Sequence, residues 1–186
     1  VESRHGCLLS IAATIDAFIL HWEASAEKRD TPEARAVSTQ VANIWDIFGS
    51  VSGPTNDDLT FQTSRPELTA EASSCLIYSL SRSALATDLA QPLEPLLNRA
   101  LQILSLCVSR SDDISIETSS SALAQLFPLL SRSKQQETVR FWFAHLRTSW
   151  RLPAGRGQIL ALGTVFRQFG AQSDVQEDIV TEILRY

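Results

Sequence analysis

The side chains in this sequence that could perform chemistry are few and lie far apart. The residues that most often bind metals are His5, His21, His145, Cys7, Cys75 and Cys107. None of the histidines has a histidine or acidic partner at the spacing of metal ligands, and the cysteines form no CxxC pair. We therefore expect surface or core histidines rather than a metal site. The odd number of cysteines argues against a disulfide framework and indicates a reducing compartment.

Other short motifs do not match sites of catalysis or cofactor binding. The segment GRGQILALG (Gly155–Gly163) lacks the GxGxxG spacing of a phosphate-binding loop, and no strand is predicted before it. The triplet Asn56–Asp58 lacks the ligand ladder and the terminal glutamate of an EF-hand. No GxSxG motif occurs. The sequence therefore predicts neither enzymatic activity nor a bound cofactor.

One basic and aromatic segment, VRFWFAHLRTSWRLPAGRG (Val139–Gly157), could instead bind a protein. At the helical angle per residue, Arg140, Arg147 and Arg151 fall within about 40° of one another, beside an apolar stripe. Either these arginines cover the edge of the core and pair with acids on a neighbouring helix, or they form an interaction surface. Phe141 points nearly opposite the stripe. The candidate partner-binding residues are Arg140, Phe141, Arg147, Arg151 and Arg156.

Helices must position these side chains, because apolar residues recur throughout the chain at helical spacing. Helix-start signals precede most of the stripes, as in Thr31-Pro32-Glu33. The predicted helices are 4–28, 33–48, 67–82, 92–109, 117–131, 135–150, 156–170 and 174–186. Pro128 should kink or end the fifth of them. The sequence predicts an all-α protein of about eight helices.

Two kinds of segment lie between the predicted helices. The stretch 49–64 is rich in Gly, Ser, Thr, Asn and Asp, and is expected to be a mobile surface loop. The tripeptide Ser-Arg-Ser occurs three times, beginning at Ser81, Ser109 and Ser131. We interpret it as a helix ending, because an arginine there favours the negative end of the helix dipole.

Internal similarity indicates repeated units. Arg4–Phe18 aligns with Gly155–Phe169, so that Gly6 meets Gly157, and Glu71–Leu80 aligns with Glu117–Leu126. Longer helices separate these segments, so that two kinds of helix alternate. Pairs of this type bury their apolar faces by stacking, which predicts an α-solenoid of HEAT or armadillo type.

Composition restricts the kind of partner. The chain has 186 residues and a net charge of −5, with a pI near 5.2, which argues against nucleic acid or an anionic membrane. No uninterrupted apolar run approaches the ~18 residues of a membrane span. The chain starts at Val1 without a signal-peptide pattern. We expect a single HEAT-like domain over 1–186, taken from a larger solenoid.

A family resemblance adds to this prediction. The segment ESRHGCLLSIAATIDAFI (Glu2–Ile19) resembles a helix that opens the C-terminal region of tubulin-folding cofactor D, the tubulin-specific chaperone D. Glu71–Leu80 and Glu117–Phe127 follow in the order of that family. RGQILALGTVF (Arg156–Phe166) is similar to the family's Cys-Gly-apolar-Leu-Ala-Leu-Gly-Ala-Leu helix. The stretch 49–64 matches nothing distinctive in the family.

The resemblance implies a cytosolic HEAT-repeat chaperone associated with the microtubule cytoskeleton. Its partners would be β-tubulin or the αβ-tubulin dimer, tubulin-folding cofactors C and E, and an Arf-like small GTPase. Together these cofactors stimulate GTP hydrolysis by tubulin, but the family associates the catalytic arginine with cofactor C. No catalytic residue therefore transfers to this chain. The alternative is a HEAT-repeat scaffold of another assembly, such as a transport adaptor or a phosphatase.

Overall fold

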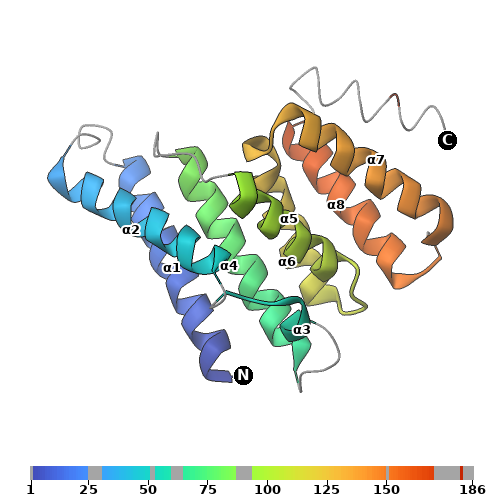
Figure 1. Cartoon of the computed structure of the whole chain (residues 1–186), viewed down its shortest axis with the longest axis horizontal. Coiled ribbons are helices and arrows are strands. Elements are labelled where there is room, and N and C mark those ends of the chain that lie inside the picture. Colours follow the sequence, from blue (N-terminus) through green and yellow to red (C-terminus); the bar gives the residue numbers. More distant parts are fainter. Residues whose placement is uncertain are drawn as a thin grey trace.

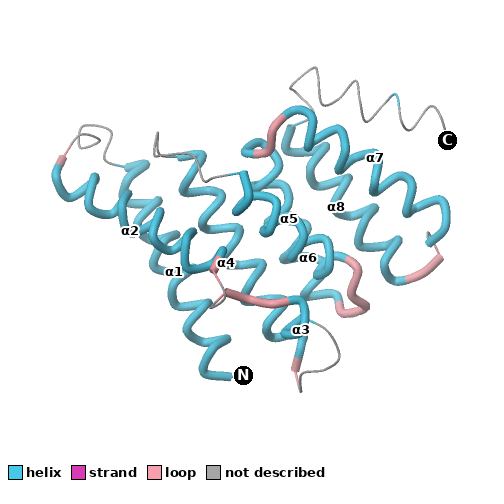
Figure 2. The backbone as a smooth tube through the Cα atoms, viewed as in Figure 1, coloured by secondary structure: helices cyan, strands magenta, loops and turns pink. Residues whose placement is uncertain are grey.

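The fold was analysed in a computed structural model, which describes residues 2–24, 31–50, 53–59, 65–86, 94–149, 151–169 and 181. These residues form helices joined by turns, with no strand among them, which confirms the prediction of an all-α protein (Figure 2). The elements are α1 (Glu2–Ala24), α2 (Pro32–Gly49), α3 (Asn56–Leu59), α4 (Pro66–Ala86), α5 (Glu94–Val108), α6 (Asp113–Leu126), the 3-10 turn η2 (Phe127–Leu129), α7 (Arg132–Ser149) and α8 (Pro153–Phe169). The last predicted helix, 174–186, lies outside the described residues except for Thr181.

The helices form two layers (Figure 1). In the first layer α1, α4, α6 and α8 lie side by side in that order, and each packs mainly on its neighbours in the layer. Contacts at matching ends show that α1 and α4 run in the same direction: His5 lies 3.8 Å from Glu71, and Arg82 lies 3.0 Å from Glu23. The second layer contains α2, α5 and α7, of which α5 packs on α6 and α7 on α8. All four segments that resemble one another in sequence belong to the first layer.

Small side chains allow α4 to pack closely between α1 and α6. Buried serines and alanines on the facing surfaces are Ala70, Ala72, Ser73 and Ser74 on α4, and Ser119, Ser120 and Ala122 on α6. The hydroxyl of Ser119 donates back to the carbonyl of Ser115, as helical serines often do. The hydroxyls of Ser73 and Ser120 are buried and have no hydrogen-bond partner within the described part of the chain. Close packing here therefore leaves some polar groups unsatisfied.

Large side chains fill the space between the two layers. Phe127 and Trp142 are almost fully buried and stack with their ring centroids 6.5 Å apart. Ile77 and Leu104 are likewise excluded from solvent. The helix α6 ends at Leu126, and Pro128 follows two residues later in η2, because proline lacks the N–H that would continue the α-helical hydrogen bonds. The prediction that Pro128 ends the helix is confirmed.

The expected mobile loop is anchored where it is described. Within 53–59 the chain forms the short helix α3, and Gly53, Pro54 and Leu59 are buried. Arginines of α1, α5 and the turn after α5 donate to its carbonyls: Arg4 to Gly53 at 2.8 Å, Arg99 to Pro54 at 3.0 Å and Arg110 to Leu59 at 2.9 Å. Local composition indicates a loop, but these arginines come from distant parts of the sequence.

The Ser-Arg-Ser tripeptide is not a general helix ending. The copy at Ser109 does follow α5, as predicted. The copy at Ser81 lies inside α4, where its two serines are buried against neighbouring helices and the helix continues to Ala86. The copy at Ser131 precedes and begins α7. The interpretation is therefore wrong for two of the three copies, because small serines suit close helix packing as well as they suit a helix end.

One helix in the described part of the chain, α1, is long and apolar enough to cross a membrane by length and composition alone. Its most apolar region, Ser3–Glu23, has a mean hydropathy of 1.3, and only 17% of that window is buried. The sequence offers no uninterrupted apolar run, but the average over the helix passes this test. One side of α1 packs on α4 through Ala12, Ile15 and Ile19, and its other side is open.

Gly157 is required by a close approach between α8 and α5. A Cβ atom on Gly157 would lie 1.9 Å from the carbonyl oxygen of Val108, whereas a Cβ on Gly163 would meet nothing within 4 Å. We predict that Gly157→Ala lowers the free energy of unfolding by about 1–3 kcal/mol through overpacking. The matched Gly163→Ala should raise it by up to about 1 kcal/mol through helix propensity. Urea unfolding followed by circular dichroism measures both, and equal effects would contradict the contact.

Candidate functional site

The five predicted partner-binding residues come from two helices and the turn between them. Arg140, Phe141 and Arg147 lie on α7, Arg151 follows the end of that helix, and Arg156 lies on α8. All five are exposed. Because α7 ends at Ser149, the helical angle that aligned Arg151 with the other two arginines does not apply to it. Consecutive residues on a helix differ by about 100°, so Phe141 faces a different direction from Arg140.

The arginines also make contacts within the chain. Arg156 pairs with Asp113 at the start of α6, with 2.7 Å between Nη1 and Oδ1. Both side chains are about two-thirds exposed, so this pair contributes little to stability. Arg140, Arg147 and Arg151 likewise have interaction partners within the chain. Arg156 thus pairs with an acid on a neighbouring helix of the first layer.

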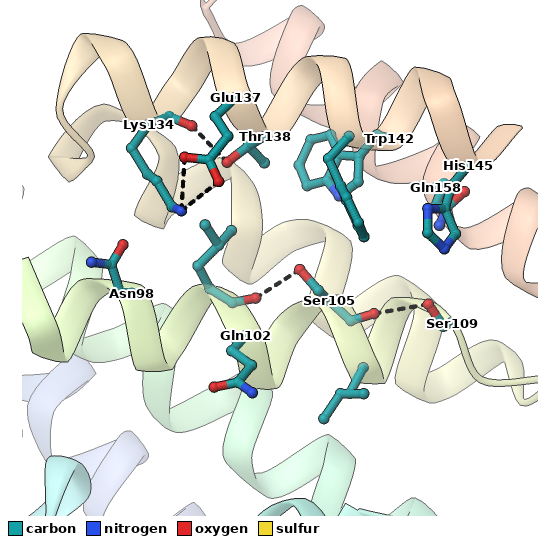
Figure 3. A pocket seen from close by; sticks show the side chains of 13 residues that line it. Asn98, Gln102, Ser105, Ser109, Lys134, Glu137, Thr138, Trp142, His145 and Gln158 are labelled. Carbon is teal, nitrogen blue, oxygen red and sulfur yellow. Dashed lines mark hydrogen bonds and ion pairs between the residues drawn. The ribbon is translucent and has the colours of Figure 1, made fainter.

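Phe141 lies in a groove between α5 and α7, which has a volume of about 410 Å³ (Figure 3). On the α7 side Phe141 is 49% exposed, and its ring centroid lies 4.5 Å from that of His145. On the α5 side Leu106 is also exposed, while Trp142 is buried at the base. Half-exposed aromatic and aliphatic side chains on facing walls are typical of a surface that binds a partner.

Polar side chains in the same groove lack partners. Gln158 of α8 is 3% exposed, and its Oε1 accepts no hydrogen bond from any residue that the structure describes. The Oδ1 of Asn98 is also buried and unpaired. At one end of the groove, Lys134 and Glu137 satisfy each other through contacts of 2.9 and 3.0 Å. The unpaired acceptors beneath the groove therefore lower the stability of the fold.

The α5 side of the groove was not predicted. Helical periodicity predicted a helix with an apolar face over 92–109, but it did not indicate which helix would lie opposite. The exposed Leu106 carries no signal on its own, because single exposed apolar residues are common. The unpaired carbonyl of Gln158 depends on how α8 sits beneath α5 and α7. The local pattern of one helix contains none of this information.

A second hollow, of about 350 Å³, contains a cysteine and two acids. Asp16 of α1, Cys75 of α4 and Glu117 of α6 line it. Burial raises the pKa of Cys75, and the negative charges of Glu71 and Asp16 raise it further. This environment keeps Cys75 a thiol and disfavours the nucleophilic thiolate. Within the described ranges, no group of three histidine, cysteine or acidic side chains could hold a metal ion.

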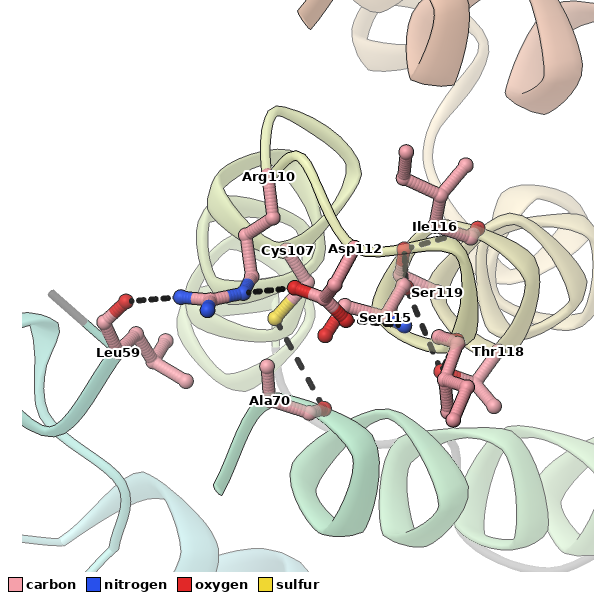
Figure 4. A network of polar contacts seen from close by, with 10 residues as sticks. Leu59, Ala70, Cys107, Arg110, Asp112, Ser115, Ile116, Thr118 and Ser119 are labelled. Atoms are coloured by element: carbon pink, nitrogen blue, oxygen red, sulfur yellow. Dashed lines mark hydrogen bonds and ion pairs between the residues drawn. The ribbon is translucent and has the colours of Figure 1, made fainter. Parts of the chain in front are cut away.

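A polar network joins the turn after α5 to the start of α6 (Figure 4). Asp112 caps α6 by accepting a hydrogen bond from the Ser115 backbone N–H at 2.9 Å, and it accepts another from Arg110 Nε at 2.8 Å. Arg110 also donates to the carbonyl of Leu59. Partial burial disfavours the charged form of Asp112. The hydrogen bonds from Ser115 and the charge of Arg110 outweigh this, so the pKa of Asp112 lies below its ordinary value.

Cys107 lies beside this network and is chemically inert. Its Sγ contacts the carbonyl oxygen of Ala70 at 3.9 Å, and burial raises the pKa of its thiol to about 12. The thiol therefore stays protonated at neutral pH and packs as a small apolar group. The network and Cys107 together fix the contact between α4, α5 and α6, and they form a structural rather than a binding site.

The fold and the groove define a chain of packed helices with an open, partly apolar surface between α5 and α7. No family model matches the sequence, and no curated protein or solved structure is significantly similar to it. The resemblance to tubulin-folding cofactor D is therefore supported only by the sequence segments that carry it. These residues lie on α1, α4, α6 and α8, so they belong to the first layer rather than to the groove walls.

We predict that Gln158→Met raises the free energy of unfolding by about 1 kcal/mol, because it removes a buried acceptor that has no partner. Methionine has nearly the same length and keeps the packing volume. Gln102→Met, at an exposed position on the α5 side of the groove, should leave stability within about 0.5 kcal/mol of the parent chain. Urea unfolding measures both variants, and a loss of stability in Gln158→Met would mean that Oε1 is paired.

The Asp112 network should also produce a pH dependence. Because folding lowers its pKa below 3.8, Asp112 stabilises the fold above that pH, and this contribution is lost as pH falls through the lower folded value. Asp112→Asn should therefore lose about 1 kcal/mol at pH 7 and show a smaller further loss between pH 5 and 3 than the parent chain. Asp113→Asn, at an exposed neighbour, is the control. Identical pH profiles for Asp112→Asn and the parent would contradict the network.

Proposed function

We propose that this chain is an α-solenoid of HEAT-like repeats that binds a protein partner and catalyses no reaction. We further propose that it is a module of a tubulin-folding chaperone in the cytoplasm. In that role it would contribute to the capture of β-tubulin, and to the assembly and disassembly of the αβ-tubulin dimer. Cofactors C and E and an Arf-like small GTPase would act with it. The observation that carries the proposal is the alternation of the two layers along the chain.

The solenoid interpretation is supported by the pairing of helices. α6 and α8 each pack on the second-layer helix that precedes them in the chain, α5 and α7 respectively, whereas α2 packs more on α5 than on α4. The same kind of pair therefore recurs along the chain and stacks on its predecessor. Stacking of this kind produces an extended surface that can hold a folded partner.

The binding interpretation is supported by the groove between α5 and α7. Phe141 and Leu106 offer exposed apolar surface on facing walls. A protein segment that inserts an apolar side chain beside Phe141 would cover this surface. Arg147 and Arg151 lie outside the groove near the end of α7 and would meet an acidic partner surface by charge complementarity.

The tubulin interpretation is supported by the resemblance at Glu2–Ile19 and Arg156–Phe166. These segments form the two helices at the ends of the first layer, α1 and α8. Tubulin presents an acidic surface, which suits the arginines at the end of α7. The groove and the arginines are separate surfaces, so a folded partner such as tubulin could contact both, whereas a short peptide would contact one.

We predict a complex of this chain with purified αβ-tubulin in size-exclusion chromatography, weakened between low and moderate salt. Phe141→Ala should weaken it at least tenfold, since aromatic anchors in an interface contribute about 2 kcal/mol or more. The double reversal Arg147→Glu with Arg151→Glu should weaken it and remove its salt dependence. Ile114→Ala, at an exposed position on α6, is the matched control.

Two outcomes would contradict the proposal in different ways. No complex at either salt concentration would exclude direct tubulin binding by this chain and favour a scaffold in another assembly. A complex that neither Phe141→Ala nor the double reversal weakens would show that tubulin binds elsewhere on the chain. Circular dichroism of each variant separates loss of binding from loss of folding.

A further inference from the structure

The first and last described helices of the first layer, α1 and α8, are related by sequence. Arg4–Phe18 aligns with Gly155–Phe169, and both helices occupy end positions in the same layer. The equivalent positions on this face are Gly6 and Gly157, Cys7 and Gln158, Ser10 and Ala161, Ile11 and Leu162, and Thr14 and Val165. Apart from Cys7 and Gln158, each pair has nearly the same size and shape.

The face of α8 formed by these residues is its packing face. Gly157, Gln158, Ala161, Leu162 and Val165 are all buried. They contact the three helices that precede α8 in the chain, since α8 packs on α5, α6 and α7. Gly157 sits directly against the last carbonyl of α5, that of Val108, where no larger residue fits.

The equivalent face of α1 is open. Gly6, Cys7, Ser10, Ile11 and Thr14 are all exposed. Ile11 is 36% exposed, whereas its counterpart Leu162 is 8% exposed. A Cβ atom on Gly6 would meet nothing within 4 Å. The packing of α1 on α4 uses a different set, Ala12, Ile15 and Ile19. This face of α1 thus resembles the packing face of α8 in sequence, including the glycine that lies against a helix end in α8. No other part of the described chain covers it.

We propose that this open face of α1 is a docking surface for a helical unit of the kind that α5, α6 and α7 form. One helix of that unit would end with its last carbonyl against Gly6, as α5 ends against Gly157. A second helix, parallel to α1, would lie along Ser10, Ile11 and Thr14, as α6 lies along α8. The inference depends on the internal repeat and not on the groove or on tubulin.

The chemistry of the face favours a helix over a lipid bilayer. Ser10 and Thr14 lie at its centre, and the Thr14 hydroxyl donates to the carbonyl of Ser10 in the same helix. The side chains at the centre of the face are therefore small and project little from the helix. Small residues of this kind permit two helix backbones to approach closely. Lipid does not require a glycine at a position where a helix end would fit. Arg4 and Glu23, near the ends of α1, pair with Asp58 and Arg82 of the chain.

The test is an extended chain in which a copy of residues 94–151 is placed directly before Val1. Because Val1 is equivalent to Leu152, the added α5–α7 unit precedes α1 as the native unit precedes α8. The full chain is retained. We expect one cooperative unfolding transition. The free energy of unfolding should depend more steeply on urea concentration than in the parent chain, and the thermal midpoint should be higher by about 5 °C or more.

Glycine variants locate the contact. In the extended chain, Gly6→Ala should lower the midpoint by about as much as Gly157→Ala lowers it in the parent chain. In the parent chain, Gly6→Ala should not lower the midpoint, because its Cβ meets open space. Gly163→Ala is the matched control, with equal gain in helix propensity and no neighbour within 4 Å, and it should be harmless in both chains.

Several outcomes would overturn the proposal. These are two separate transitions in the extended chain, or a Gly6→Ala effect that equals that of Gly163→Ala. Sedimentation velocity of the parent chain tests a second copy as the occupant, and flotation with phosphatidylcholine vesicles tests a bilayer. Self-association or vesicle binding that Ile11→Asp abolishes would assign the face to that occupant instead. Failure of the tubulin complex would leave this inference intact, because the readout involves no tubulin.

Discussion

The close approach of α4 to α1 and α6 is the constraint on which the rest of the structure depends. Three parallel helices can lie this close only because serine and alanine occupy the facing surfaces, among them Ala72, Ser73 and Ser120. A leucine at any of these positions would separate the helices by more than the core could absorb. The cost is a set of buried hydroxyls without partners. Large residues between the layers, such as Trp142 and Leu104, offset that cost.

The groove follows from the same constraint. Because small residues hold the first layer together, its helices are closely spaced and each contacts the next. In the second layer, α5 packs on α6 and α7 packs on α8. The space between α5 and α7 is filled only in part, by Trp142 at the base, and Phe141 and Leu106 stay exposed above it. Gln158 reaches this space from below, and so a buried amide faces a surface that the chain itself does not complete.

Much of the fold could be predicted from the sequence, because helix periodicity, N-terminal caps and Pro128 act over a few residues. Contacts between distant segments could not. The stretch 53–59 reads as a loop in isolation, yet Arg4, Arg99 and Arg110 bind its carbonyls from 45 to 51 residues away in sequence. For the candidate site, Phe141 was predicted to be a surface residue, but the opposite wall at Leu106 depends on helix pairing. Arg156, another candidate residue, pairs with Asp113 of α6, a contact between distant segments that helical periodicity does not indicate.

The comparison of α1 with α8 shows why a repeated sequence predicts position better than burial. The alignment of Gly6 with Gly157 correctly places both helices in one layer, and it says nothing about their neighbours. Burial belongs to a pair of surfaces, so Val165 is covered because α5, α6 and α7 precede it, whereas Thr14 is exposed because α1 is the first described helix. Packing explains the glycine at position 157 of α8, but the helix α1 on its own does not explain the glycine at the equivalent position 6. Glycine in particular lowers helix stability, and at Gly6 no contact within the chain offsets that loss. A helix end against Gly6, placed as the end of α5 is against Gly157, would offset that loss.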